Sequence, residues 1–177
     1  MRARYFLLAI PVLMVAGALW LATPTGVAVP RVLLDDLSHL PVTIAAPYDE
    51  GADADAAVDA AFARAKASGK RVMIVLGGNW CPDCIVLANV AALPEVRPFL
   101  DRHFERVSVD VGRFDRNLQI PARFGITERL KGVPTVLVAA ADGRLLNPDD
   151  PFTLANATKM TPQGIVNWLA KWAEKPS

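Results

Sequence analysis

The chain has 177 residues, enough for one ordinary domain with a substantial core and some additional segments. Its formal net charge is +1, from 19 Lys and Arg residues against 18 Asp and Glu residues, and the two signs are interspersed. Such a balance gives no basic region of the kind that binds nucleic acid, so nucleic acid is not an expected partner.

The first 28 residues have the pattern of an export segment. Arg2 and Arg4 precede residues 5–22, which carry no charge. This run is longer than the roughly 7–15 residues of a signal-peptide core and close to the ~20 residues of a membrane span. Gly26-Val27-Ala28 offers small residues to a signal peptidase, so a cleaved signal peptide and an N-terminal membrane anchor both fit. Either way, the rest of the chain is expected in the periplasm, soluble after cleavage or anchored to the inner membrane by residues 5–22.

Residues 29–51 contain scattered apolar residues and three prolines, Pro30, Pro41 and Pro47. We interpret this stretch as a linker or a segment packed partly on the domain. A short edge strand near Val42 to Ile44 is also compatible with it.

Residues 52–177 alternate helical and strand patterns and are predicted to form one α/β domain. The order of elements requires a mixed sheet, parallel through right-handed crossovers and antiparallel at a hairpin, with helices on both faces. Residues 147–160 are expected to be a loop. The predicted elements are helix 52–68, strand 72–76, a helix from 82 to about 103 kinked at Leu93-Pro94, strand 104–111, helix 115–124, strands 135–138 and 145–146, and a helix from 162.

The two cysteines of the chain, Cys81 and Cys84, lie where the buried strand 72–76 gives way to a helix. Pro82 suits a first helical turn because its missing N–H would be unpaired there. Unpaired backbone N–H groups and the helix dipole at that point stabilise a thiolate, which makes Cys81 the expected nucleophile. Cys84 is one helical turn further on, close enough for a reversible disulfide.

The chain resembles the thioredoxin superfamily over about residues 52–173. Two motifs in the family's order carry this resemblance, Trp80-Cys81-Pro82-Asp83-Cys84 and Gly132-Val133-Pro134-Thr135. The resemblance implies a thioredoxin-like mixed sheet and a cis-proline at Pro134 facing the two sulfurs. It also implies that Val133 and Trp80 contact an extended substrate segment.

One departure from the family concerns the buried aspartate that thioredoxins carry six residues before the nucleophile. Val75 occupies that position, so a proton acceptor for Cys84 is missing there. Water or the carboxylate of Asp83 could replace it. The family's common Gly-Pro between the cysteines is also replaced here, by Pro82-Asp83.

Pro82 and Asp83 are expected to tune the pKa of the Cys81 thiol. The Asp83 carboxylate favours the helix N-terminus but places like charge near the Cys81 thiolate. An exposed contact of this kind costs about 1 kcal/mol at ~4 Å in water. We therefore expect a moderate or weak oxidant.

The leading hypothesis is a thiol-disulfide oxidoreductase that needs no cofactor and exchanges disulfides with proteins, including a membrane or periplasmic redox partner. The direction of exchange stays open. An inert structural disulfide is a weaker interpretation because a short loop gains little from closure. A metal site with His39 or His103 lacks a second ligand motif, so no metal is expected. The alternative from another class is a redox-inert binding or metal-delivery module.

Overall fold

The structure is a computed structural model that describes residues 27–174. The predicted export segment falls almost entirely outside these residues, so the structure does not bear on it. Within residues 27–174, none of the helices has both the length and the apolar character needed to cross a membrane.

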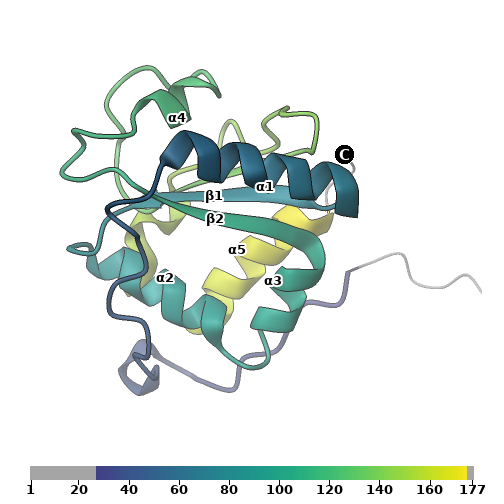
Figure 1. The fold of residues 1–177 in the computed structure, drawn as a ribbon. Coiled ribbons are helices and arrows are strands. Elements are labelled where there is room, and N and C mark those ends of the chain that lie inside the picture. Colours follow the sequence, from purple (N-terminus) through teal and green to yellow (C-terminus); the bar gives the residue numbers. More distant parts are fainter. Residues whose placement is uncertain (1–26, 175–177) are drawn as a thin grey trace, which may run out of the picture.

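A three-stranded mixed sheet forms the centre of the domain (Figure 1). Strand β1 (Arg71–Gly77) lies in the middle, parallel to β2 (Phe104–Asp110) and antiparallel to β3 (Thr135–Ala139). The register sets the end of β1 beside the end of β2 and the start of β3. The segment that follows β1 and the segment that precedes β3 therefore meet at one end of the sheet, where β1 has its carboxyl end.

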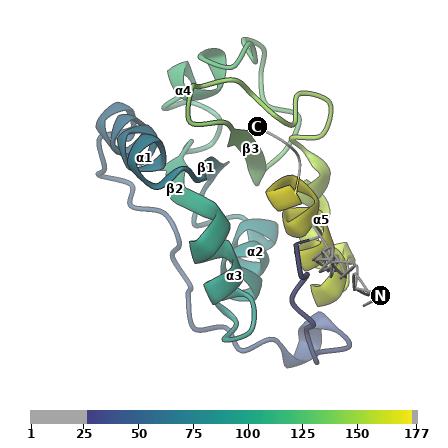
Figure 2. The same cartoon turned by 90° about the vertical axis from the view of Figure 1, so that its right-hand side faces the viewer.

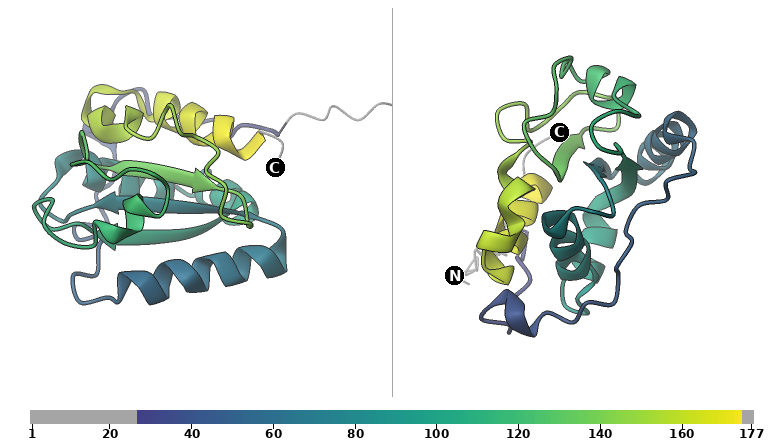
Figure 3. Two further views of the ribbon diagram at one scale, coloured as in Figure 1. Left: turned by 90° about the horizontal axis from the view of Figure 1, so that it is seen from above. Right: turned by 90° about the vertical axis from the view of Figure 1, so that its left-hand side faces the viewer.

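Helices cover both faces of this sheet, as predicted (Figures 2 and 3). Helix α1 (Ala54–Ser68) lies on one face and ends at Gly69, which has a left-handed φ of 71°. The other face carries α2 (Pro82–Ala92), α3 (Arg97–His103) and α5 (Pro162–Glu174). The remaining helical elements are η1 (Leu37–His39), α4 (Gln119–Ala122) and η2 (Thr153–Lys159).

Alternate side chains of β1 build the two cores. Val72, Ile74 and Leu76 pack toward α1, whereas Met73 packs toward α2, α3 and α5. This burial on both faces is what the continuous apolar run predicted.

The helix predicted over residues 115–124 is wrong, because only α4 is helical there. Phe114 and Asn117 have positive φ values of 68° and 54°, which interrupt a right-handed helix. The amide of Asn117 donates a hydrogen bond of 2.7 Å to the backbone carbonyl of Asp110. The segment after β2 is thus a loop folded back onto the strand end.

Three further expectations need correction. The strand at residues 145–146 is reduced to one bridge between Leu145 and Ala139, so the hairpin is minimal. Residues 147–160 are not all loop, because η2 lies within them. Residues 42–44 form no strand.

Two asparagine side chains explain why these strands are short or absent. Asn147 is fully buried beside β3, where its side chain accepts from the N–H of Val138 and donates to the carbonyl of Val136, both at 2.8 Å. Asn89 on α2 accepts from the N–H groups of Thr43 and Ile44 at 2.7 and 2.9 Å. Each amide occupies backbone groups that a neighbouring strand would otherwise pair.

Replacing Asn147 by alanine should destabilise the domain, because it leaves buried backbone groups of β3 without partners. Each such group costs about 1–3 kcal/mol, so we expect the free energy of unfolding to fall by about 2–4 kcal/mol. Urea unfolding followed by tryptophan fluorescence measures the change. Asn156→Ala, at an exposed position, is the matched control and should stay within about 0.5 kcal/mol. Equal effects of the two variants would contradict this account.

Candidate functional site

Cys81 is the N-cap residue of α2 and lies at the end of the sheet where β1 ends. Its sulfur accepts a hydrogen bond of 3.2 Å from the backbone N–H of Cys84, and Pro82 occupies the first helical turn. Both cysteines are free thiols and both are buried, each with 2% of its surface exposed. The predicted strand-to-helix position of Cys81 is confirmed.

The loop before β3 brings the second predicted motif against the first. The peptide bond between Val133 and Pro134 is cis, which confirms that part of the prediction. The backbone carbonyl of Val133 lies 3.3 Å from Cys81 Sγ, within hydrogen-bonding distance of a thiol. Residues 52 positions apart in the sequence thus meet at the nucleophilic sulfur.

The two sulfurs have opposite acidities. Hydrogen bonding to the Cys84 thiol and N–H lowers the pKa of Cys81, while burial and the Asp83 charge oppose this shift. The same hydrogen bond to Cys81, together with burial, strongly raises the pKa of Cys84. The backbone N–H of Gly78 and the Tyr48 hydroxyl act in the other direction on the pKa of Cys84. Cys81 is therefore the sulfur that ionises first.

Asp83 is held by η2. Its Oδ1 accepts hydrogen bonds from both the N–H and the hydroxyl of Thr158, each at 2.8 Å. Its charge still raises the pKa of Cys81, as the sequence predicted. The idea that this carboxylate accepts a proton from Cys84 gains no support from this geometry.

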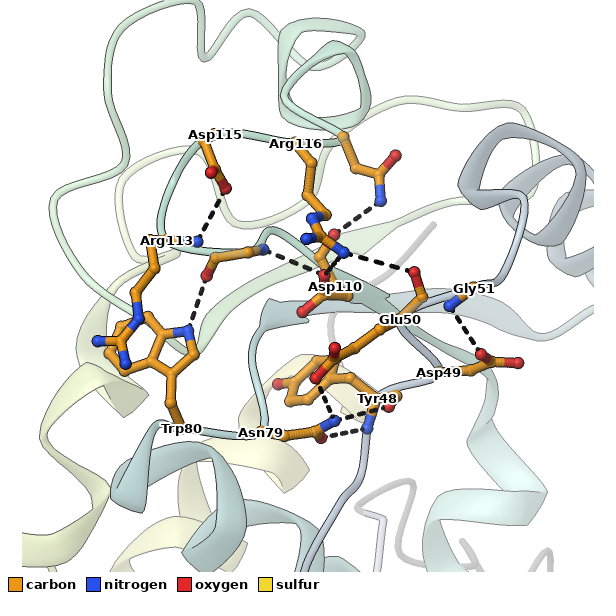
Figure 4. A network of polar contacts seen from close by, with 12 residues as sticks. Tyr48, Asp49, Glu50, Gly51, Asn79, Trp80, Asp110, Arg113, Asp115 and Arg116 are labelled. Carbon is orange, nitrogen blue, oxygen red and sulfur yellow. Dashed lines mark hydrogen bonds and ion pairs between the residues drawn. The ribbon is translucent and has the colours of Figure 1, made fainter.

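Trp80 lies beside the cysteines on the solvent side, with 39% of its surface exposed. Its indole N–H donates to the carbonyl of Gly112 at 2.7 Å, which ties it to the loop after β2. The guanidinium of Arg113 stacks over the indole at 4.5 Å (Figure 4). The ring of Phe114 meets the indole edge-on at 6.0 Å. Residues 112–114, in the irregular loop after β2, therefore orient this ring.

Tyr48 is a site residue that sequence patterns missed. It belongs to the leading segment (residues 27–53), and only 4% of its surface is exposed. Its hydroxyl forms a hydrogen bond with the Cys84 side chain. The Asn79 side chain accepts from the N–H of Tyr48 and donates to its carbonyl, both at 3.0 Å (Figure 4). Residues 29–51, predicted to be a linker or a partly packed segment, thus reach the site.

Little in the sequence pointed to Tyr48. It is one of two tyrosines, and the other, Tyr5, lies in the uncharged N-terminal run. Asn79 precedes the cysteine motif directly, but its partner is 31 positions earlier. A side chain that pairs with distant backbone leaves no periodic pattern to read.

The histidines considered as metal ligands lie elsewhere. His103 ends α3 and packs on Phe99, with 4.7 Å between ring centroids, and His39 lies beside Asp36 in η1. Across residues 27–174, no three side chains of His, Cys, Asp or Glu are grouped so that they could hold a metal ion.

Comparison with known proteins agrees with this geometry. A family model described as thioredoxin-like matches residues 53–141. The crystal structure of a disulphide isomerase from Xylella fastidiosa Temecula1 is 40% identical, with a TM-score of 0.65, over 71% of this chain and 95% of that one. None of the curated proteins matches the chain significantly.

Two other solved structures match at 16% identity. An HIV epitope-scaffold covers 70% of this chain and 86% of its own, with a TM-score of 0.41. The match to a protein of unknown function from Pseudomonas aeruginosa covers 79% of this chain and 92% of that protein's chain, with a TM-score of 0.39.

The fold and the paired cysteines define a thioredoxin-like α/β domain with a C-x-x-C site. The chain belongs to the thioredoxin superfamily.

Replacing Asp83 should lower the pKa of Cys81. Asp83→Asn removes the charge but keeps an oxygen that can accept from Thr158, so it isolates the electrostatic effect. We expect a fall of less than about one pKa unit and a larger fall for Asp83→His. Thiolate absorbance against pH measures the value.

Asp149→Asn removes an exposed charge elsewhere and should leave the pKa of Cys81 unchanged. An unchanged or raised pKa in both Asp83 variants would contradict the role given to this carboxylate.

Proposed function

We propose that the protein is a thiol-disulfide oxidoreductase that exchanges disulfides with protein substrates. The observation that carries the proposal is the asymmetry of the two sulfurs. The pKa of Cys81 is lowered, and its sulfur lies against the carbonyl of Val133. Burial and the hydrogen bond to Cys81 raise the pKa of Cys84, so Cys84 stays protonated. A reactive thiolate paired with a protonated thiol is what disulfide exchange requires.

In the reductive direction, the Cys81 thiolate attacks one sulfur of a substrate disulfide and forms a mixed disulfide, releasing the other substrate sulfur as a thiolate. Cys84 then loses its proton and attacks Cys81 Sγ. The bond between Cys81 and the substrate breaks, and the second substrate sulfur leaves. Two electrons pass to the substrate, and the Cys81–Cys84 disulfide remains. The reverse sequence oxidises a dithiol.

Trp80, Val133 and Pro134 are the proposed substrate-contacting residues. The carbonyl of Val133 contacts Cys81 Sγ, Pro134 follows it through the cis peptide bond, and Trp80 is a partly exposed aromatic residue directly before Cys81. Because only 2% of Cys81 is exposed, a substrate must bind against these residues and displace local contacts to reach the sulfur. We expect selectivity for disulfides in extended, accessible segments.

We further propose that the protein is exported and acts in the periplasm, with a membrane or periplasmic partner that resets its redox state. The charge pattern of residues 1–28 supports this location. The carboxylate of Asp83 beside the thiolate supports a moderate or weak oxidant.

The reaction is tested by insulin-disulfide reduction with a chemical reductant, together with trapping variants. Cys84→Ser should accumulate mixed disulfides with proteins through Cys81, because the releasing attack is lost. Cys81→Ser is the matched control and should trap none. Diagonal gels reveal the trapped species. No insulin reduction, with stoichiometric copper or zinc in the purified protein, would favour the metal-delivery alternative.

A further inference from the structure

We propose that Tyr48 is a catalytic residue, whose hydroxyl donates a hydrogen bond to Cys84 Sγ and stabilises the thiolate that resolves the mixed disulfide. This inference rests on the proposed oxidoreductase function and deepens it. It assigns a chemical role at Cys84 to the leading segment, in a chain where Val75 occupies the sequence position of the family's buried aspartate.

The placement of Tyr48 is tightly determined. Asn79 binds both backbone groups of Tyr48 and also donates to the Glu50 carboxylate at 3.0 Å (Figure 4). Gly77 provides the space, since a Cβ there would lie 2.6 Å from Cys84 Sγ and closer still to the Tyr48 hydroxyl. The Tyr48 hydroxyl and Cys84 Sγ therefore both lie beside Gly77 at the end of β1.

The hydrogen bond matters most after the mixed disulfide has formed. In the free dithiol, Cys84 donates to Cys81, and this interaction is the largest cause of its raised pKa. Once Cys81 is bonded to a substrate, its charge and this interaction are gone. Burial then opposes ionisation of Cys84, and two donors favour it, the N–H of Gly78 and the hydroxyl of Tyr48.

The surroundings keep the phenol protonated, as a donor must be. Burial, the two cysteines and the nearby carboxylate of Asp110 all raise the pKa of Tyr48. Asp110 is itself buried and paired with Arg116 at 3.2 Å. The phenol thus remains a neutral donor through the cycle.

The proton that Cys84 loses has a route to water. A cavity of about 510 Å³ reaches Cys84 and is also lined by Tyr48 and Val75, and this is many times the ~30 Å³ that one water occupies. The Cys84 proton passes to water there, and the departing substrate thiolate takes up a proton. The charged side chains that line the same cavity are Lys70, Asp101, Glu105 and Arg106.

The test uses the reduced full-length protein mixed with a smaller amount of dithiobis-nitrobenzoate. Cys81 attacks the reagent and releases a first thionitrobenzoate. Cys84 then attacks Cys81 Sγ and releases a second, so two absorbance phases in stopped flow report the two cysteines separately. Measuring the rate of each phase as a function of pH gives a pH midpoint for each cysteine.

In Tyr48→Phe, we expect the second phase to slow by about fivefold to tenfold at neutral pH, with its pH midpoint raised. The first phase should keep its rate. Ser108→Ala removes a hydroxyl from another residue lining the cavity and should change neither phase. An unchanged second phase, or an equal slowing of both phases, would overturn the proposal.

A second variant covers the case in which Tyr48→Phe does not fold. In a Tyr5→Phe background, Tyr48 is the remaining tyrosine, and biosynthetic 3-fluorotyrosine makes it a more acidic donor. The second phase should then accelerate, and an unchanged rate would overturn the role of Tyr48. Failure of the unaltered protein to release thionitrobenzoate and to reduce insulin would instead overturn the oxidoreductase function itself.

Discussion

The hydrogen bond from the backbone N–H of Cys84 to Cys81 Sγ is the interaction on which the rest of the site depends. It exists because Cys81 caps α2, and it supplies part of the stabilisation that a buried thiolate needs. The same cap fixes the direction of the sulfur, which then meets the carbonyl of Val133.

The site stabilises negative charge on the cysteine sulfurs with hydrogen-bond donors. A carboxylate close to Cys84 would accept its proton but would also add charge to an already buried pair. Here the groups that favour the Cys84 thiolate are the N–H of Gly78 and the hydroxyl of Tyr48, and the carboxylate of the preceding residue, Asp83, accepts hydrogen bonds from Thr158. Neutral donors ease ionisation at a smaller cost in buried charge.

Asparagine side chains recur where the small sheet and the leading segment need backbone partners. Asn147 pairs with β3, Asn89 holds residues 43–44 to α2, and Asn79 holds Tyr48 beside the cysteines. A side-chain amide offers both N–H donors and an acceptor oxygen, so it can replace part of a neighbouring strand. These side chains supply backbone partners to a three-stranded sheet and to an irregular leading segment.

The sequence alone determined the features that depend on neighbouring residues. A continuous apolar run placed β1, and apolar periodicity placed α1 and α5. The motif Cys81-Pro82-Asp83-Cys84 marked the junction where a thiolate is stabilised. Tertiary structure decided what depends on distant partners. The positive φ values after β2, the minimal hairpin at β3 and the hydrogen bond between Tyr48 and Cys84 arise from contacts between separate segments. Such contacts are specific to one pair of atoms and impose no repeat on the sequence, so periodicity and composition cannot reveal them.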